Sequence, residues 1–497
     1  MVKRKQVHKD KLNMIYRGDG MIGLKRGQVE LCDHQNEWKE NATVTINKLW
    51  EIFNGIAVDI QHIGSTAIHG IKAKPMLDIA VGVENFDNLA EVYPKLDENG
   101  IYKSSTQPLP GIVLCAIKDY RESDIVLCNL HIVVIGSDQW NNHIVFRDYM
   151  NAFPEKAAVY EKLKIELAQQ YPTDREAYCN GKNEFINSCI SEAHIYIEIK
   201  QKLDIKAFEP INEGLSGDKK YFLEVADGKR FLLRISDVSE YERKKTMFDI
   251  MIKATDIGLP MCKPVDFGIC SAGKTVYQLL TWCEGDNLDK VLSTLPKTEQ
   301  YAIGIKAGVI LKAIHTIPVS HDFDDWSVRY YKQNDGRIKA FTNCGIQIDG
   351  SDEILRFIEN NKHLLHNRPQ CFIHGDFHTG NLMISSSGDL SVIDWEMLDF
   401  DNYADPWNEF NRIGLSDIHP YFTTGLLRGY FNGEPPIDFW SLLAFYLSAG
   451  SLMLVSWAYY LQQDELDFAM QQVRNVLNWY DNMQCVIPNW YIKNYGG

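Results

Sequence analysis

Apolar and polar positions alternate along the first part of the chain and give way to helical spacing towards its end. Runs with a period of two predict strands. They read IAVDIQHIG, MLDIAVGV, GIVLCAI and DIVLCNLHIVVIG, between residues 56 and 136. Helical stretches separate and follow these runs, and the last is EKAAVYEKLKIELAQQY. The pattern predicts an α/β or α+β domain over residues 1–195 and a connector at 196–207.

A second pattern covers residues 208–497. Two strand-like runs, YFLEVA and RFLLRIS, follow a glycine-rich turn, and a helical stretch with further strand-like runs completes residues 208–284. From residue 285 to 497 the spacing is mostly helical. We therefore expect an α+β multidomain protein whose last domain joins a small sheet-rich lobe to a larger helical lobe.

One apolar segment, residues 439–463, contains no charged side chain and is long enough to span a bilayer. It also holds four serines and a glycine, and the nearest basic residues, Arg428 and Arg474, are remote. Charges that anchor a membrane helix are missing from its flanks. We therefore expect a buried core helix and no membrane association.

Charge and cysteine usage narrow the class of partner and the compartment. The net charge is −15 at pH 7, and most of the negative charge lies after residue 195. Such a surface repels nucleic acid and attracts small polycations, although it also serves solubility alone. The 11 cysteines are odd in number and form no Cys-x-x-Cys pair, and the basic start lacks the apolar stretch of a signal peptide. We expect a cytoplasmic protein with reduced thiols.

The segment HGDFHTGNLMI, followed by VIDWE, carries the main candidate chemistry. Asp376 lies five residues before Asn381, and Asp394 lies thirteen residues after Asn381. Asp376 can accept the proton of a substrate hydroxyl, while Asn381 and Asp394 offer the oxygen ligands that Mg²⁺ prefers. The pattern therefore predicts phosphoryl transfer. The alternative is a turn-forming Asp and Asn with an unrelated Asp394.

Upstream residues supply candidate contacts to a nucleotide triphosphate. Gly214, Ser216 and Gly217 lie in the turn EGLSG, whose backbone N–H groups can cover phosphates, although most such turns are plain hairpins. Arg234 lies on a predicted strand and Glu242 on the helix after it. Together they can form the ion pair that holds a cation against the phosphates. A surface ion pair is the alternative.

The first domain has a candidate site of its own. Gly64 and Ser65 follow an apolar run, and Asp78 lies in the next run, thirteen residues after Ser65. In a nucleotidyltransferase a Gly-Ser turn that opens a helix presents N–H groups and a hydroxyl to the triphosphate, and an aspartate on the following strand binds Mg²⁺. The alternative is a helix-capping serine and a solvated aspartate.

The motifs of the second domain resemble the catalytic loop and metal aspartate of aminoglycoside phosphotransferases and related small-molecule kinases. The resemblance runs from about residue 208 to the end. It implies a two-lobed protein-kinase-like fold with Asp376 as base, Asn381 and Asp394 as Mg²⁺ ligands, and ATP or GTP as co-substrate. QLLTWCEGD, which contains Leu280, is implied to lie at or near the hinge that holds the nucleotide base. Arg234 stands where most of the family has lysine, which leaves a pseudokinase open.

The same resemblance indicates the acceptor. We expect an aminoglycoside, because the acidic second domain can supply the carboxylates that its ammonium groups need. Such an acceptor would make the chain an antibiotic-resistance enzyme. Asp399, Asp401 and Glu409 are candidates for these carboxylates. Kinases of macrolides, choline, homoserine and methylthioribose use the same loop, so another metabolite or antibiotic stays open as the acceptor.

The first domain resembles the GrpB family of nucleotidyltransferase-like proteins. The matching pieces are HIGSTAI, KPMLDIAVGV, LHIVV, FRDYM and DREAYCNGKNEFI. Lys74 and His131 lie in these pieces, and a phosphate or metal role is implied for them. His69 stands where the family usually has proline. Nucleotidyltransferases usually place a second carboxylate where this chain has Ala80, and two-metal chemistry is hard to assemble with one.

Three functions therefore stay open. The first is a kinase of a small cationic molecule, with a nucleotide-binding or regulatory first domain. The second is a bifunctional kinase and nucleotidyltransferase, and the third is a nucleotide-sensing protein.

Overall fold

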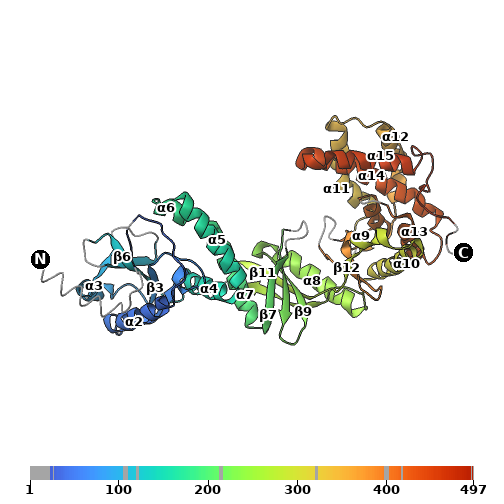
Figure 1. The fold of residues 1–497 in the computed structure, drawn as a ribbon. Coiled ribbons are helices and arrows are strands. Elements are labelled where there is room, and N and C mark those ends of the chain that lie inside the picture. Colours follow the sequence, from blue (N-terminus) through green and yellow to red (C-terminus); the bar gives the residue numbers. More distant parts are fainter. Residues whose placement is uncertain are drawn as a thin grey trace. The chain divides into compact units, whose positions relative to one another are not determined.

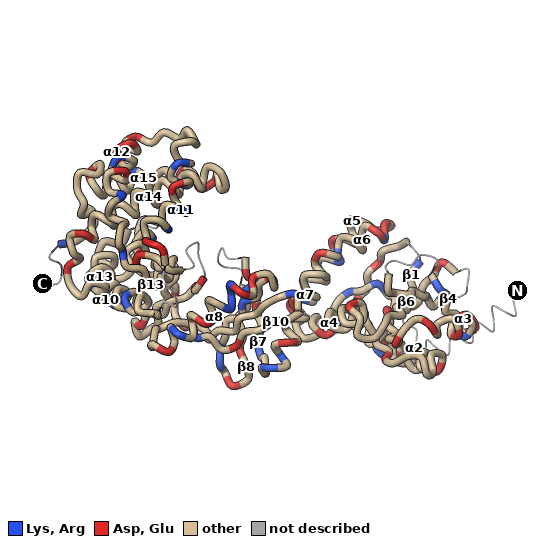
Figure 2. The backbone as a smooth tube through the Cα atoms, turned by 180° about the vertical axis from the view of Figure 1, so that it is seen from behind, with Lys and Arg blue, Asp and Glu red and all other residues tan. Residues whose placement is uncertain are grey.

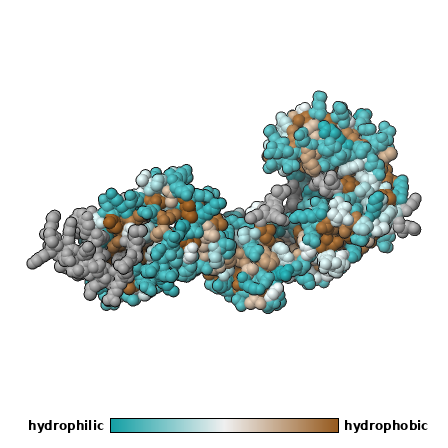
Figure 3. All heavy atoms as spheres, viewed as in Figure 1, coloured by the Kyte–Doolittle hydropathy of each residue, from teal (hydrophilic) through white to brown (hydrophobic). Residues whose placement is uncertain are grey.

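A computed structural model describes residues 23–25, 27–104, 110–118, 123–211, 217–271, 273–318, 323–396, 402–415, 418–493 and 495. The chain divides into two compact units, Met1–Asp204 and Ile205–Gly497 (Figure 1). Each unit combines helices and sheet, so the chain has the α+β multidomain fold that the sequence predicts. On the face shown in Figure 3 hydrophilic residues predominate, with hydrophobic residues exposed in smaller patches.

The first unit contains a six-stranded mixed sheet. Its order is β2-β3-β6-β5-β4, and β1 also pairs with β6. The pair β3–β6 is parallel and the other pairs are antiparallel. The strands are β1 (Leu24–Lys25), β2 (Ala57–Ile63), β3 (Leu77–Val83), β4 (Ile101–Lys103), β5 (Ile112–Lys118) and β6 (Ile125–Val134).

Helices cover both faces of this sheet. The helices are α2 (Glu37–Ile52), η1 (Ser65–Ala67), α3 (Leu89–Glu98), α4 (Asp138–Ala152), α5 (Pro154–Gln170), α6 (Arg175–Asn180) and α7 (Asn183–Lys200). Ile79 and Val81 of β3 join a core with α2 and α3, while Ala80 packs with Trp140 of α4. Because neighbouring strand residues point to opposite faces, β3 is apolar on both sides, and Asp78 is its one charged residue.

The second unit begins with a five-stranded antiparallel sheet of order β10-β11-β9-β8-β7. Its elements are β7 (Ile205–Ile211), β8 (Lys219–Val225), β9 (Arg230–Asp237), η2 (Val238–Glu240), α8 (Tyr241–Asp256), β10 (Pro264–Cys270) and β11 (Thr275–Thr281). Helix α8 contacts β10 and β11. The runs YFLEVA and RFLLRIS become β8 and β9, as the alternation predicts.

A larger helical part follows. Its helices are α9 (Leu288–Val291), η3 (Leu292–Thr294), α10 (Lys297–Ile314), α11 (Trp326–Asn343), α12 (Ser351–Asn361), η4 (Lys362–Leu365), η5 (Thr379–Asn381), η6 (Pro406–Leu415), α13 (Pro420–Phe431), α14 (Ile437–Leu461), η7 (Gln463–Glu465) and α15 (Leu466–Trp479). Its short strands are β12 (Asp286–Asn287), β13 (Cys371–Phe372), β14 (Leu382–Ile384), β15 (Leu390–Val392) and β16 (Tyr403–Ala404). This order confirms the small sheet-rich lobe and the larger helical lobe.

Helix α14 contains the long apolar segment. It is long and apolar enough to cross a membrane, but 78% of its most apolar window is buried inside the unit. Asp438 is its one charged residue. Elsewhere in the chain Lys and Arg are interspersed with Asp and Glu along both units (Figure 2). The helix packs against α11, α12, α15 and η6. It therefore lies in the core, as the sequence predicts.

Helices α10 and α13 approach each other at four glycines. A Cβ atom at Gly304 would lie 2.1 Å from the carbonyl oxygen of Phe422, and one at Gly308 would lie 2.1 Å from that of Leu426. Gly425 and Gly429 meet backbone atoms of α10 at 2.3 and 2.2 Å in the same way. These contacts are with backbone, which cannot rotate away as a side chain can. The crossing of α10 and α13 therefore requires glycine at all four positions.

Candidate active site

The turn between β13 and β14 brings the predicted base and a predicted metal ligand together. Asn381 Nδ2 donates hydrogen bonds to Asp376 Oδ2 at 2.8 Å and to the Asp376 carbonyl oxygen at 2.9 Å. Burial raises the pKa of Asp376, but the hydrogen bond of His378 and the charge of Arg412 outweigh burial and lower that pKa to about 2. Asp376 is therefore an ionised hydrogen-bond acceptor in a fixed orientation.

His374 joins this turn to the strand that precedes Asp394. Its Nδ1 accepts a hydrogen bond from the backbone N–H of Asp376 at 3.3 Å, and its Nε2 donates one to the carbonyl oxygen of Ile393 at 3.1 Å. Burial lowers the pKa of His374. The histidine is thus a neutral brace between the two segments.

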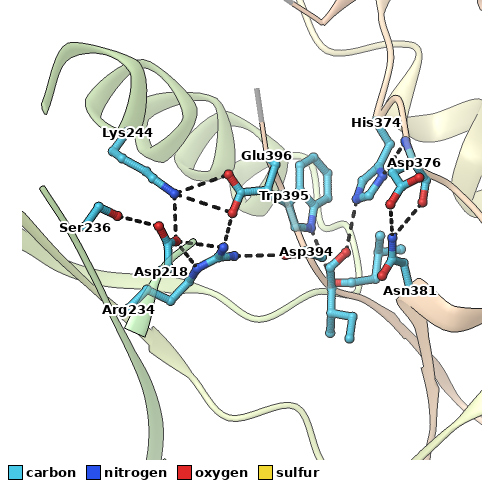
Figure 4. Close-up of polar contacts among 12 residues, drawn as sticks. Asp218, Arg234, Ser236, Lys244, His374, Asp376, Asn381, Asp394, Trp395 and Glu396 are labelled. Atoms are coloured by element: carbon cyan, nitrogen blue, oxygen red, sulfur yellow. Dashed lines mark hydrogen bonds and ion pairs between the residues drawn. The ribbon is translucent and has the colours of Figure 1, made fainter. Parts of the chain in front are cut away.

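Asp394 follows β15 and lies next to this turn. The backbone N–H of Ile393 donates to the carbonyl oxygen of Asn381 at 3.0 Å, which ties the two segments together. Asp394 has a φ of +62°, a left-handed conformation that aspartate tolerates better than most residues. Its carboxylate accepts a hydrogen bond from Arg234 Nη1 at 3.1 Å. Figure 4 shows Asp394 between the Arg234 contacts on one side and Asp376 and Asn381 on the other.

The donor set at this position fits Mg²⁺. Because Asn381 uses its amide nitrogen to hold Asp376, its amide oxygen is left for a cation. In the described part of the chain no three His, Cys, Asp or Glu side chains converge as a metal cluster. Mg²⁺ characteristically takes one or two protein oxygens and completes its shell with water and substrate phosphates. Asn381 and Asp394 can provide those protein oxygens.

An ion-pair network surrounds Arg234 on β9 (Figure 4). Arg234 is 4% exposed and donates from Nε to Asp218 Oδ2 at 2.9 Å. It also pairs with Asp394 and, through Nη2, with Glu396. Lys244 Nζ lies 2.7 Å from Asp218 Oδ2 and 3.3 Å from Glu396 Oε2. Two buried cations therefore share three carboxylates, which satisfies charges that would be costly to bury alone.

The predicted ion pair between Arg234 and Glu242 is wrong. Glu242 lies on the exposed side of α8, and the described carboxylates that pair with Arg234 are Asp218, Asp394 and Glu396. The physical reason is the phase of α8. Lys244 shares a face with the buried Met247, Phe248 and Met251, so it points inwards where Glu242 does not.

The glycine turn is described only at its end. Gly214 and Ser216 lie outside the described residues. Gly217 is exposed, and a Cβ atom there would meet no atom within 4 Å. The next residue, Asp218, accepts hydrogen bonds from Arg234, Lys244 and, at 2.6 Å, from Ser236 Oγ. The end of the turn is thereby tied to β9 and α8.

Leu280 lies on a strand of the sheet rather than in a loop. It is the penultimate residue of β11, pairs with Leu232 of β9 and with Pro264 of β10, and is buried. The strand ends at Thr281. Its role beside a nucleotide base stays a prediction.

Glu409 binds the backbone of the turn that holds Asp376 and Asn381, which we call the catalytic turn after its predicted base. Its carboxylate accepts hydrogen bonds from the backbone N–H of Gly375 at 2.8 Å and of Phe377 at 3.3 Å. His315 Nε2 lies 3.7 Å from Glu409 Oε2. Glu409 is therefore a positioning residue. Its carboxylate is not presented to a substrate ammonium group, and Asp399 and Asp401, the other two carboxylates considered for that role, lie outside the described residues.

A cavity of about 910 Å³ opens beside the catalytic turn. Gly375, Glu409 and Arg412 form the part nearest to the turn, and α11, α14 and α15 provide other lining residues. Arg412 Nε donates to the carbonyl oxygen of Gly375 at 2.8 Å and lies 3.5 Å from Asp376 Oδ1. Arg412 therefore contacts both the cavity and the predicted base.

In the first unit, Asp78 is the centre of a polar cluster. Asn129 Nδ2 donates to Asp78 Oδ1 at 2.8 Å, and His131 Nε2 lies 3.7 Å from the same oxygen. Burial raises the pKa of Asp78, but its interactions with His131 and Asn129 lower it to about 2. The pairing of β3 with β6 produces this cluster, because Asp78 lies opposite Asn129 in the parallel register.

The predicted Gly-Ser turn lies directly over Asp78. Gly64 has a φ of +71°, and a Cβ atom there would lie 2.6 Å from Asp78 Oδ2. Ser65 opens only the three-residue η1, not the helix that the sequence predicts. Three residues do not build the dipole of a longer helix, so the helix expected here is corrected, while phosphate contacts of Gly64 and Ser65 stay a prediction. Gly64 is needed for close approach to Asp78.

Two lysines share one aromatic ring near this cluster. The Nζ atoms of Lys74 and Lys182 lie 5.2 and 4.5 Å from the ring centroid of Tyr178. Burial and the charge of Lys182 lower the pKa of Lys74. Neither ammonium group has an ion-pair partner among the described side chains. His69 is exposed and bonds through its backbone to Asn151 at 2.8 Å, so it lies outside this group.

Comparison with known proteins assigns both units. Residues 28–192 match the GrpB protein family, and residues 207–440 match the phosphotransferase enzyme family. The glutamate-rich protein GrpB of Alkalihalophilus pseudofirmus is 38% identical over 173 residues, which are 35% of this chain and 99% of that protein. The chain belongs to the GrpB family and carries a phosphotransferase-family domain.

More distant relatives match one domain each. UPF0157 protein YqkA of Bacillus subtilis is 26% identical to the GrpB domain over 33% of this chain, which spans less than half (47%) of YqkA. The crystal structure of GrpB from Enterococcus faecalis has 26% identity and a TM-score of 0.30, covering 33% of this chain and 96% of that one. ADP-bound aminoglycoside phosphotransferase APH(2'')-Ib has 15% identity and a TM-score of 0.42, covering 57% and 99%.

Sequence reasoning missed four residues of the phosphotransferase domain, namely Asp218, Lys244, Glu396 and Arg412. Two carried a visible signal. Lys244 interrupts the apolar stripe of α8, where a charged residue needs a buried partner. Glu396 is the last residue of VIDWE, two positions after Asp394. The contact between Arg412 and Asp376 has no signal in local sequence.

Proposed function

We propose that the phosphotransferase domain transfers the γ-phosphate of ATP or GTP to a hydroxyl group of a small molecule. The observation that carries this proposal is that Asp376 and Asn381 are hydrogen-bonded in one turn, which His374 and the backbone of Ile393 tie to the segment of Asp394. An oriented carboxylate beside two oxygen ligands for a divalent cation is the arrangement that phosphoryl transfer to an alcohol needs.

In this proposal Asp376 orients the acceptor hydroxyl and accepts its proton. The acceptor oxygen forms the new bond to the γ-phosphorus, the bond from phosphorus to the β–γ bridging oxygen breaks, and the electron pair leaves with ADP or GDP. Asn381 keeps Asp376 in position and, with Asp394, offers oxygens to Mg²⁺, which neutralises phosphate charge when bound. Arg234 places a positive charge next to Asp394, and Lys244 adds a second positive charge to the same network through Asp218 and Glu396.

The acidic chain supports a cationic acceptor, with an aminoglycoside as the first choice. We place the reaction in the cytoplasm, as the cysteine usage predicts. This acceptor stays a prediction. Neither a nucleic acid nor a membrane is part of the proposal.

The test is an assay of ADP or GDP formation by the full chain with a panel of aminoglycosides and other small alcohols. We expect acceptor-dependent turnover with at least one compound, and loss of that turnover when EDTA removes the divalent cation. Chemistry at about 1 to 1,000 per second is typical of enzymes and is easily detected. Nucleotide binding without turnover on any acceptor would instead favour a pseudokinase.

A second candidate function concerns the GrpB domain, for which we propose binding of a phosphate-containing ligand such as a nucleotide. The two ammonium groups of Lys74 and Lys182 at Tyr178 favour an anion, because neither forms an ion pair with a described carboxylate. Asp78 is available to a Mg²⁺ ion that accompanies the phosphates. Ala80 supplies no second carboxylate, so binding or regulation fits better than nucleotidyl transfer.

Calorimetry of ATP binding to the full chain tests this second proposal. We expect two equivalents of nucleotide per chain, and only one in Lys74→Met, because a buried lysine that meets phosphate contributes a charge-assisted hydrogen bond. Lys95→Met, at an exposed position of α3, is the matched control. One equivalent in the unchanged chain would refute the proposal. Asp78-dependent pyrophosphate release would move the assignment to nucleotidyl transfer.

A further inference from the structure

Two cysteine thiols meet at one end of the strand pair β10–β11. Cys262 lies two positions before β10, and Cys283 lies two positions after β11. The strands are antiparallel, and their pairing continues to Lys263, whose carbonyl oxygen accepts a hydrogen bond from the backbone N–H of Thr281 at 2.9 Å. The chain beyond these two residues therefore brings the cysteines side by side. Each thiol is a hydrogen-bond partner of the other.

Both cysteines are attached to β15, the strand that precedes the predicted metal aspartate. On one side, the backbone N–H of Val392 donates to the carbonyl oxygen of Pro260 at 2.8 Å, two positions before Cys262. On the other side, the side chain of Ser391 is a hydrogen-bond partner of the Cys283 thiol. The thiol pair thus lies where the five-stranded sheet meets β15.

The segment that contains Cys283 is the one predicted to lie at or near the nucleotide base. The backbone N–H of Trp282 donates to the carbonyl oxygen of Arg230 at 3.0 Å. The ring of Trp282 meets the ring of Phe222 edge-on, with 5.0 Å between the ring centroids. Glu284 also pairs with Arg230 at 3.0 Å. These contacts fix the segment to β8 and β9 on both sides of Cys283.

The pair has the properties of thiols that can be oxidised. Cys283 is partly exposed, so a small oxidant can reach it, whereas Cys262 is 3% exposed. The hydrogen bond from Cys283 outweighs burial and lowers the pKa of Cys262, which favours the reactive thiolate. A second thiol beside the reactive one is typical of redox-sensing cysteines. In a reducing compartment such a disulfide is transient.

We propose that Cys262 and Cys283 form a reversible disulfide that weakens nucleotide binding by the phosphotransferase domain. With hydrogen peroxide as the oxidant, the thiolate of Cys262 attacks one peroxide oxygen, the O–O bond breaks, and the hydroxide that leaves takes up a proton to give water. The thiolate of Cys283 then attacks the sulfur of the sulfenic acid, the S–O bond breaks, and a second water forms in the same way. The two thiols lose two electrons to the peroxide. The control of nucleotide binding rests on the proposed kinase function, whereas the disulfide itself does not.

The expected effect follows from the length of the new bond. The sulfurs of a disulfide lie about 2.0 Å apart, closer than in any hydrogen bond between them. Closing this distance draws Cys283 towards Cys262 and away from Ser391, while Trp282 stays bound to Arg230. The segment predicted to lie at the base is thereby displaced.

Mass spectrometry of the full chain tests whether the disulfide forms. After treatment with hydrogen peroxide and alkylation of the remaining thiols, we expect a link between Cys262 and Cys283 that dithiothreitol removes. Cys262→Ser should abolish the link and Cys270→Ser should keep it. Cys270 is the matched control because it lies on β10, is buried like Cys262, and its Sγ lies 3.0 Å from Thr275 Oγ1. Recovery of both thiols in alkylated form, at a peroxide concentration that oxidises the exposed Cys485, would overturn the proposal.

Calorimetry of ATP binding tests the control of nucleotide binding. The Lys74→Met chain is used, so that the site proposed in the GrpB domain does not contribute. We expect ATP to bind the oxidised chain at least about tenfold more weakly than the reduced chain, a difference of about 1.4 kcal/mol, and dithiothreitol to restore the affinity. In Cys283→Ser, peroxide should leave the affinity unchanged. A linked chain that binds ATP as tightly as the reduced chain would overturn the inference.

Turnover distinguishes failure of this inference from failure of the kinase proposal. Weaker ATP binding on oxidation, with no phosphate transfer to any acceptor, would support control by the disulfide and reject the kinase. Phosphate transfer whose KM for ATP does not change on peroxide treatment would support the kinase and reject control by the disulfide.

Discussion

Replacing Asp376 with asparagine is expected to lower kcat for phosphate transfer by about 1,000-fold, the range in which a general base contributes. Asparagine keeps the size of the side chain and can still accept the hydrogen bond from Asn381, but it cannot take up the proton of the acceptor hydroxyl. Nucleotide affinity should change by less than about twofold, or about 0.4 kcal/mol, because the substitution removes no phosphate contact.

Steady-state ADP formation and calorimetry of nucleotide binding measure the two effects of Asp376→Asn. Asp389→Asn is the matched control, since Asp389 lies in the β14–β15 turn and bonds only within that turn, for example to Ser387 Oγ at 2.7 Å. The folded-state pKa of Asp376, about 2, is below its usual value. Asp376 is therefore ionised at every pH above about 4. A loss of turnover in Asp376→Asn at neutral pH thus reflects the missing carboxylate and not a change in the protonation of Asp376. Unchanged turnover would remove Asp376 from the role of base.

Gly304→Ala is expected to destabilise the phosphotransferase domain by about 3 kcal/mol or more, at the upper end of overpacking substitutions. The new methyl group would lie 2.1 Å from the carbonyl oxygen of Phe422, so α10 and α13 must move apart. Separation also weakens the packing at Gly308, Gly425 and Gly429. Urea unfolding of the full chain, followed through the transition of this domain, measures the change.

Gly450→Ala provides the comparison, because it makes the same substitution within a helix where the added atom meets nothing. The two variants should shift the unfolding midpoint in opposite directions. Equal shifts would show that helix propensity, not the contact of α10 with α13, decides the effect at Gly304.

The grouping of Asp376, Asn381 and Asp394 could be predicted from sequence because the three residues are close along the chain, and their catalytic roles stay predictions. Asp376 and Asn381 lie in one turn, and Asp394 lies just after the second strand of the short hairpin that follows. Few conformations of so short a stretch separate these side chains. The core position of α14 was equally predictable, because an uncharged stretch without flanking anchors has one favourable place in a globular unit.

The partners of Arg234 could not be predicted because they come from distant parts of the chain. Asp394 is 160 positions away, and its contact depends on how the sheet packs on the helical part. The error at Glu242 has a different origin. A helix turns by about 100° per residue, so moving two positions to Lys244 reverses the side from exposed to buried. Similarly, local sequence does not reveal the close approach of Gly64 to Asp78.

Under the proposed kinase function, the contact between Arg234 and Asp394 would link the affinities for the divalent cation and for the nucleoside triphosphate. A lone divalent cation that approaches Asp394 meets a guanidinium group 3.1 Å from the carboxylate oxygen and is repelled by it. A triphosphate reverses that repulsion, because its negative charge draws Arg234 and the cation towards the same ligand. If Asp394 holds the cation as proposed, occupancy by either component would strengthen retention of the other.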